Sequence, residues 1–173
     1  MSVKSLCTAL LPLSAQIEEF FKEKASEAVI PEDAVSRFVA TASAYIRVGG
    51  DMAGYIPFKD YIALPPAAAF KSMECYYAAT LHELGHWSGH ETRLKRELST
   101  RFGSDSYAAE ELVAKLTSTF LCAQLGVQCE LWHSGYIDHW LILHRNDPKA
   151  IFTAGSRASQ AATHVQSFSE HTQ

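Results

Sequence analysis

The pentapeptide His82-Glu83-Leu84-Gly85-His86 limits what this chain can fold into more than any other stretch of its sequence. On an α-helix, residues four apart lie one turn above each other, so both imidazoles project from one face and can share one Zn²⁺ ion. Glu83 lies about 100° around the helix, where a carboxylate can accept a proton from a water at the metal. The pattern predicts the active-site helix of a zinc-dependent hydrolase.

The residues before the pentapeptide favour a helix that is buried along one side. Large apolar side chains recur there at helical spacing, at Phe70, Met73, Tyr77, Leu81 and Leu84. Small residues, among them Ala78, lie on the face of the two histidines and would let another element approach the metal closely. We predict that this helix spans about residues 67–88 and ends at Gly89.

Length and composition fit one globular domain. The chain has 173 residues, of which 47% are hydrophobic and 20% charged, enough to bury a real core. We predict a single domain over residues 1–173, with a helical extension over residues 1–30. The net charge of −4 argues against binding nucleic acid through a basic surface. Direct DNA binding is therefore not expected for this domain alone.

Neither export nor membrane insertion is indicated by the sequence. No apolar run approaches the length of a membrane span, and the first residues make a poor signal peptide. The four cysteines form no C-x-x-C pair, which favours reduced thiols. We predict a cytoplasmic location.

Three short segments predict a small sheet. Residues 44–48 and 54–58 alternate like strands around the turn signal Gly49-Gly50-Asp51-Met52, which indicates a β-hairpin. Residues 60–64 form a third extended segment before two prolines. Tyr61–Leu64 could be an edge strand that pairs with an extended substrate, or the sheet could simply cover the active-site helix.

The remaining segments are predicted as helices, at about residues 15–28, 31–41, 107–125, 135–144 and 148–168. The expected fold class is therefore α+β. We predict a mostly helical domain with a small antiparallel β-sheet beside the active-site helix.

A catalytic zinc requires a third protein ligand and one open position. His90 would lie about 12 Å along a continuous helix from His82, too far to share one ion. In another known pattern a third histidine follows a glycine turn, and here Gly89 is in place but Thr92 stands where that histidine would be. The ligand must therefore come from another element.

The next long helix supplies two candidates, Glu110 and Glu111, which point about 100° apart, so only one can face the metal. We favour Glu111, because Ala114, Ser118 and Cys122 continue its stripe and allow a close helix approach. Glu110 stays the alternative, and both could simply be favourable acidic charges at a helix N-terminus. If Glu111 is the ligand, Glu110 is expected to form an exposed ion pair with Arg93 or Arg96, worth about 0–1 kcal/mol.

With these residues assembled, the chain resembles the zincin-like metallopeptidase domain of the antirestriction protein ArdC, TraC-type plasmid primases, and polyvalent proteins of phages and other mobile elements. The likeness is carried by residues 60–65 (DYIALP), 76–90 (YYAATLHELGHWSGH), 93–96 (RLKR) and 107–114 (YAAEELVA).

The resemblance implies a zincin-like fold with a gluzincin-like Zn²⁺ site, in which His82 and His86 are ligands, Glu83 is the base and a glutamate of the second block, again Glu111, is the third ligand. ArdC-like proteins carry a single-stranded-DNA-binding domain before this one. Residues 1–28 are too short to form it, so that domain is not expected here.

Two functions follow as expectations. The first is a zinc metalloendopeptidase of a plasmid, phage or other mobile element, acting on a protein or peptide substrate. Tyr136 is the oxyanion donor we select, with Tyr107 and His133 as alternatives. The second is a non-cleaving, zinc-stabilised interaction or antirestriction module that binds DNA-processing proteins. Glu83 favours the enzyme, because a structural zinc site has no use for a general base.

Overall fold

The computed structural model describes residues 32–98, 105–128 and 149–170. Its elements, in chain order, are α2 (Glu32–Thr41), β1 (Tyr45–Val48), β2 (Gly54–Ile56), the 3-10 turn η1 (Pro57–Lys59), β3 (Tyr61–Leu64), the 3-10 turn η2 (Ala67–Ala69), α3 (Met73–Ser88), α4 (Asp105–Gln124) and α6 (Ala150–Glu170). The fold is α+β, as predicted. The helices predicted at 15–28 and 135–144, and the extension over 1–30, lie outside the described residues.

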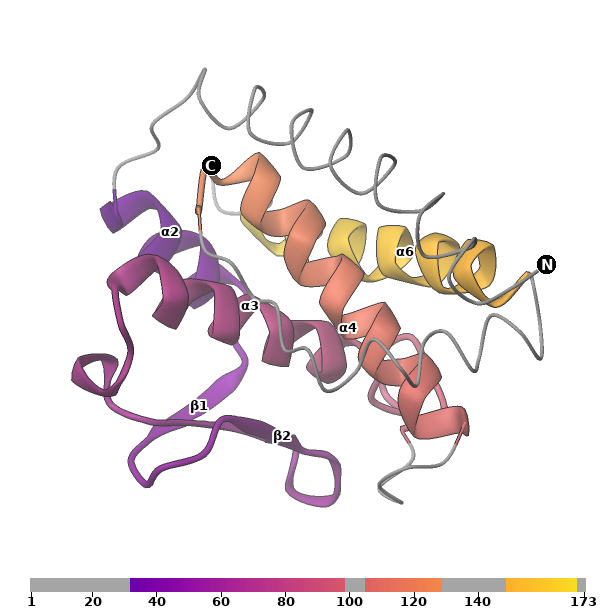
Figure 1. Cartoon of the computed structure of the whole chain (residues 1–173), viewed down its shortest axis with the longest axis horizontal. Coiled ribbons are helices and arrows are strands. Elements are labelled where there is room, and N and C mark those ends of the chain that lie inside the picture. Colours follow the sequence, from indigo (N-terminus) through magenta and orange to yellow (C-terminus); the bar gives the residue numbers. More distant parts are fainter. Residues whose placement is uncertain (1–31, 99–104, 129–148, 171–173) are drawn as a thin grey trace, which may run out of the picture.

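Helix α3 is the centre of the arrangement, with the sheet on one side and α4 and α6 on the other (Figure 1). Ser72 caps its N-terminus by accepting a 3.3 Å hydrogen bond from the Cys75 backbone N–H. The helix begins at Met73 rather than near residue 67, because Ala67–Ala69 form a separate 3-10 turn after the two prolines. It ends before Gly89, as predicted.

Helices α3 and α4 approach each other closely where small residues face each other. A Cβ atom on Gly85 of α3 would lie only 3.0 Å from the Ala114 Cα of α4. One turn further along α4, the Ser118 hydroxyl donates a 2.9 Å hydrogen bond to the Ala78 carbonyl. The close approach predicted from the small residues of both helices is therefore confirmed.

The sheet differs from the prediction in its pairing. Its strand order is β1-β3-β2, with β1 parallel and β2 antiparallel to β3. The predicted hairpin between residues 44–48 and 54–58 is wrong, because these strands do not pair with each other, and the sheet is mixed rather than antiparallel. Gly49 also bonds to β3, donating to the Leu64 carbonyl at 2.8 Å. Strand β3 therefore lies between the two strands that a hairpin would join.

Strand β3 lies in the middle of the sheet, so the prediction of Tyr61–Leu64 as an edge strand is wrong. Its inner side chains, Ile62 and Leu64, are completely buried. The most deeply buried strand therefore takes the central position, where both of its edges are paired and its apolar face covers α3. Strands β1 and β2 form the two edges.

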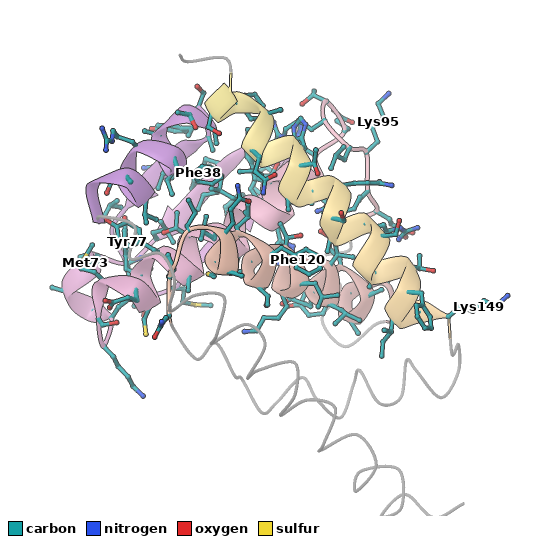
Figure 2. All side chains as sticks on the ribbon, turned by 90° about the horizontal axis from the view of Figure 1, so that it is seen from above. Phe38, Met73, Tyr77, Lys95, Phe120 and Lys149 are labelled. Carbon is teal, nitrogen blue, oxygen red and sulfur yellow. The ribbon has the colours of Figure 1, made fainter. Side chains whose placement is uncertain are left out.

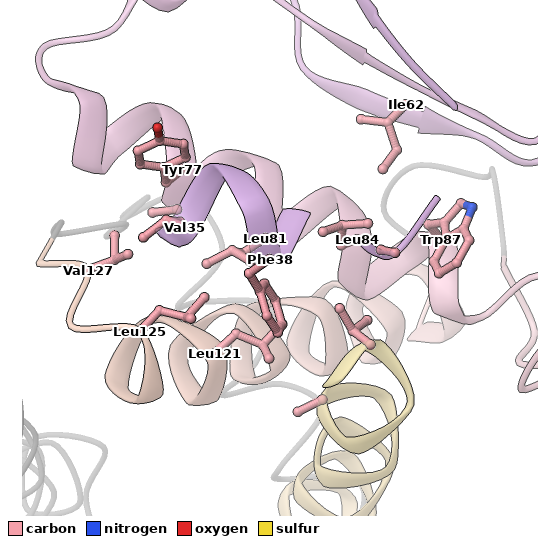
Figure 3. Packing of buried hydrophobic residues seen from close by; sticks show 14 of the residues in the cluster. Val35, Phe38, Ile62, Tyr77, Leu81, Leu84, Trp87, Leu121, Leu125 and Val127 are labelled. Carbon is pink, nitrogen blue, oxygen red and sulfur yellow. The ribbon is translucent and has the colours of Figure 1, made fainter. Parts of the chain in front are cut away.

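The main core surrounds α3 (Figure 3). Leu81 and Leu84 of α3, Ile62 of β3 and Leu121 of α4 are fully buried there. Each such side chain contributes about 1.5–3 kcal/mol by its burial. The core therefore holds the helix of the pentapeptide between the sheet and α4.

Helix α6 runs across α4 (Figure 2). Phe120 of α4 packs against the main core and also against a second, smaller cluster formed by Leu112, Val113, Ala154 and Ala158. The buried face of α6 is made mostly of small residues, namely Ala154, Ala158, Ala161, Ala162 and Val165. Ile151, near the start of the helix, is 47% exposed. Helix α4 is followed by Gly126, whose φ of 63° is left-handed and suits the end of a helix.

Within the three described ranges, no helix is long and apolar enough to cross a membrane. Cys75 is disulfide-bonded, so the prediction of reduced thiols is wrong for this residue. Cys122 is a free thiol, whereas Cys7 and Cys129 lie outside the described residues. The cytoplasmic location stays a prediction.

Candidate metal centre

His82 and His86 project from the same face of α3. Their ring centroids lie 4.9 Å apart and the ring planes are nearly perpendicular, at 89°. This is the placement that a spacing of four residues predicts for two imidazoles on one helix. Two nitrogen donors are thus available to one ion.

Helix α4 brings Glu111 to the two imidazoles. Glu111 Oε2 lies 3.6 Å from His82 Nε2, and Glu111 Oε1 lies 3.4 Å from His86 Nε2. One donor atom from each of the three residues lies within 4.8 Å of the other two. Two imidazole nitrogens and a carboxylate oxygen form a donor set that suits a divalent metal ion such as zinc. The three residues can therefore hold such an ion.

The electrostatics of the three residues reflect their proximity. Burial alone would raise the pKa of Glu111, but hydrogen bonds to His82 and His86 hold that pKa well below its usual range. Burial alone would lower the pKa of His86, but hydrogen bonds to Glu110 and Glu111 and the charge of Glu83 raise it to about 10. Because a metal binds the neutral imidazole, metal binding would release any proton that these charges hold on Nε2 of His86.

Glu83 lies on α3 between the two histidines in sequence and is only 7% exposed. Its charge helps to raise the pKa of His86, which places its carboxylate near the site. Glu83 is not one of the three residues whose donor atoms converge. Glu83 is therefore a buried carboxylate beside the three converging residues rather than one of them.

Glu110 lies behind His86 rather than in the group of three. Its Oε1 is 3.4 Å from His86 Nδ1, the ring nitrogen turned away from Glu111. Arg96 donates to both of its oxygens, from Nη2 to Oε1 at 2.8 Å and from Nε to Oε2 at 3.0 Å. The structure thus gives the two neighbouring glutamates different positions around one imidazole.

Glu110 was predicted to form an exposed ion pair with an arginine, but the pair that it forms is buried. The Arg96 and Glu110 side chains are only 6% and 8% exposed. The loop after α3 folds back on the helix end, with the Arg96 N–H donating to the Gly89 carbonyl at 2.9 Å. This fold-back buries the Arg96 guanidinium against α3 and α4, which sequence spacing alone could not show.

Arg93 takes a different partner from Arg96. Its Nη1 donates to Asp60 Oδ2 at 3.0 Å, and its Nη2 donates to the Tyr55 hydroxyl at 3.1 Å. Its Nε donates to the Trp87 carbonyl at 2.6 Å, and the guanidinium carbon lies 3.9 Å from the centroid of the Trp87 ring. Arg93 therefore joins the end of α3 to the sheet.

The other residues considered for the site are the three candidate oxyanion donors and His90. Tyr136 and His133 lie outside the described residues, and Tyr107 lies on α4 one turn before Glu111. His90 is not among the converging donors, and its Nδ1 lies 2.8 Å from the Thr92 hydroxyl.

Lys115, one turn after Glu111 on α4, is a further ionisable residue beside Glu111 that was not predicted from the sequence. Burial lowers its pKa to about 8, against the nearby charges of Glu111 and Cys122. Its spacing of four residues from Glu111 was the available signal.

Comparisons with known proteins agree with this geometry. A family model described as a zincin-like metallopeptidase matches residues 33–157. The chain is 44% identical over 140 residues to the protein y4eC of Sinorhizobium fredii, covering 78% of this chain and 46% of y4eC. It is 41% identical over 134 residues to a DNA primase TraC of Escherichia coli, covering 76% of this chain and 13% of the primase.

A solved structure is similar over most of the chain. It is the Mn(II)-bound crystal structure of the antirestriction ArdC protein from the R388 plasmid, with a TM-score of 0.75 and 36% identity. The match covers 84% of this chain and 55% of that one. This chain thus spans about half the length of y4eC and of ArdC, and a smaller part of the primase.

Proposed function

Because this chain belongs to the zincin-like metallopeptidase family, we propose that it is a zinc-dependent endopeptidase that hydrolyses peptide bonds in a protein or peptide substrate. The observation that carries the proposal is the convergence of His82, His86 and Glu111 within 4.8 Å, with buried Glu83 on the same helix. The three converging residues would be the metal ligands. The Mn(II) named for the ArdC structure supports a divalent ion in a fold of this kind.

The roles of the side chains follow from their chemistry. Zinc, when bound, supplies Lewis-acid polarisation of the substrate carbonyl and lowers the pKa of water. Glu83 would accept a proton from the attacking water and pass it to the leaving amine. Three protein ligands leave the open position that catalysis requires. Tyr136 is our proposed donor to the oxyanion.

A second candidate function is favoured by the names of the relatives. They are an antirestriction protein of a plasmid and a DNA primase, neither of which is named as a peptidase. We therefore keep the alternative of a non-cleaving, metal-stabilised module that binds DNA-processing proteins of a mobile element. With a net charge of −4, such a module would contact protein rather than DNA.

The substitution Glu83→Gln separates the two functions. Wild type, Glu83→Gln and His90→Ala would each be loaded with zinc and incubated with unfolded casein and a mixed peptide library, and products would be identified by mass spectrometry. We expect cleavage by wild type and by His90→Ala, whose imidazole lies outside the metal site. Glu83→Gln should retain one zinc ion per chain and cleave nothing, including itself.

The result that contradicts the peptidase is equally definite. If wild type and Glu83→Gln, both carrying zinc, give identical product lists, the non-cleaving module becomes the better description.

A further inference from the structure

The guanidinium of Arg96 joins the two helices that carry the candidate metal ligands. Besides Glu110 of α4, it contacts two groups of α3: Nη2 donates to the Gly85 carbonyl at 2.6 Å and Nη1 donates to the Ser88 hydroxyl at 3.0 Å. The Ser88 hydroxyl in turn donates to the same Gly85 carbonyl at 2.6 Å. Arg96 therefore fixes the last turn of α3 relative to the first turns of α4.

The contacted groups are the immediate neighbours of the candidate ligands. Gly85 directly precedes His86, and Glu110 directly precedes Glu111. A shift of α3 against α4 at this point would change the separation between the imidazoles and the Glu111 carboxylate. Arg96 thus lies where a single side chain can control that separation.

Glu110 also acts on the imidazole itself. With its Oε1 3.4 Å from His86 Nδ1, the carboxylate favours a proton on Nδ1 and leaves Nε2, which faces Glu111, free to bind a metal ion. His82 has no such support, because its buried Nδ1 has no hydrogen-bond partner among the described residues. Among the described residues, a carboxylate therefore contacts the Nδ1 atom of His86 but not that of His82.

Gly89 provides the space that this arrangement needs. Its φ is −80°, which any residue can adopt, so backbone conformation does not require glycine here. A Cβ atom on Gly89 would instead lie 2.8 Å from Arg96 Nη2 and 2.8 Å from Leu98 Cδ2. The glycine after the helix thus makes room for the guanidinium.

We propose that Arg96 and Glu110 form a positioning pair for His86: Glu110 fixes the orientation of the imidazole through Nδ1, and Arg96 holds Glu110 and the end of α3 in register. The inference rests on the metal site of the proposed function and adds two residues that do not bind the ion. Arg96 balances the charge of Glu110, so the pair orients His86 without adding net charge beside Glu111.

The experiment compares zinc affinity in variants that separate positioning from stability. The double variant Arg96→Met/Glu110→Leu replaces a buried ion pair by apolar side chains, an exchange that is often neutral for stability. Glu110→Gln keeps an oxygen that can accept from Nδ1. The matched control is Arg93→Met/Asp60→Asn, which removes the other arginine–carboxylate pair of the same loop, and asparagine tolerates the left-handed φ of 49° at position 60.

Three quantities would be measured for each protein: zinc affinity against a competing chelator, the visible absorption of bound cobalt(II), and the urea midpoint of the metal-free form. For the double variant we expect about 10–100-fold weaker zinc binding, the scale for lost partners of metal-binding histidines, and a shifted cobalt band with a midpoint near wild type. Glu110→Gln should lose less affinity than the double variant. The control should bind zinc as wild type does.

The outcomes distinguish this inference from the proposed function. A wild-type protein that binds neither zinc nor cobalt would overturn the metal centre itself. Equal zinc affinity in wild type and the double variant would overturn only the positioning pair. If the double variant does not fold, Glu110→Gln decides: weaker zinc binding with a shifted cobalt band supports the pair, and no change in either overturns it.

Discussion

Two arginines of one loop, three residues apart, hold different parts of the molecule together. Arg93 joins the end of α3 to the sheet side through Asp60 and Tyr55, whereas Arg96 joins α3 to α4 through Glu110. Each donates to both oxygens of a carboxylate, Arg93 through its two Nη atoms and Arg96 through Nε and Nη2. They differ in burial, since the Asp60 side chain is 39% exposed and that of Glu110 is 8% exposed.

The difference in burial determines how much stability is lost when each ion pair is broken. A pair in contact with water contributes about 0–1 kcal/mol, because solvent screens the charges. Breaking a buried pair costs about 3–5 kcal/mol, because the remaining charge has no compensation. Two similar contacts in one loop should therefore respond very differently to the same substitution.

The largest effect is expected for Arg96→Ala. Removing the guanidinium leaves the buried Glu110 carboxylate without its cation, so the free energy of unfolding of the metal-free protein should fall by about 3–5 kcal/mol. Urea denaturation at neutral pH measures this loss. A loss no larger than that of Arg93→Ala would remove the distinction between the two pairs.

The next effect is expected for Gly89→Ala. The added methyl group would clash with Arg96 and Leu98, and crowding of this kind costs about 1–3 kcal/mol. The cost should shrink when Arg96→Ala is already present, because one of the two clashes is gone. A double-mutant cycle measures that coupling, and strictly additive costs would show that Gly89 does not make room for the guanidinium.

A smaller effect is expected for Arg93→Ala. The screened pair with Asp60 contributes about 0–1 kcal/mol and the contact with the Trp87 ring about 0.5–1 kcal/mol, so the loss should be about 0.5–2 kcal/mol. Urea denaturation at neutral pH gives this value, and a loss of the size expected for Arg96→Ala would contradict it.

The pH dependence of that loss sharpens the comparison. The hydrogen bonds from Arg93 hold the pKa of Asp60 below its usual value. The stabilisation by Asp60 is therefore present above about pH 4, the pKa of an unfolded aspartate, and disappears as the pH falls through the lower folded value. The difference between wild type and Arg93→Ala should shrink in acid, and a difference that grows there would show that Asp60 is not the partner that matters.

The smallest effect on stability is expected for Lys95→Gly, at a position between the two arginines. Its sign is opposite to the others, because this substitution should stabilise the protein. Lys95 is exposed and has a φ of 49°, a left-handed conformation that strains any residue with a Cβ atom. Glycine removes the strain but is more flexible in the unfolded chain, so the net gain should be at most about 1 kcal/mol. Thermal unfolding detects it, and a lower midpoint would indicate that the lysine side chain itself stabilises the loop.

The candidate metal centre could be predicted from sequence because it depends on the spacing of residues within single helices. His82 and His86 are four residues apart on one helix, and the small residues after Glu111 indicated which face of α4 approaches α3. Helical spacing fixes such relations without knowledge of the rest of the fold. The same reasoning from helical spacing left out His90, which is not among the three converging residues.

The main errors concern contacts between segments that are separated in the sequence. The hairpin prediction failed because β1 pairs with β3 in parallel, a choice that depends on which strand covers α3 rather than on the turn after β1. The exposure of the Arg96–Glu110 pair was wrong because the fold-back of the loop is a tertiary feature. Charge and spacing identified the partners but carried no information on their burial.

Gly85 and Gly89 should differ in how well they tolerate substitution. At Gly85, an added Cβ would meet the backbone of Ala114, at 3.0 Å from Cα and 3.2 Å from the carbonyl oxygen, so no smaller residue at position 114 could rescue it. At Gly89 the obstacles are the side chains of Arg96 and Leu98, which shorter residues could relieve. Saturation mutagenesis should thus find position 85 fixed and position 89 open to compensated change.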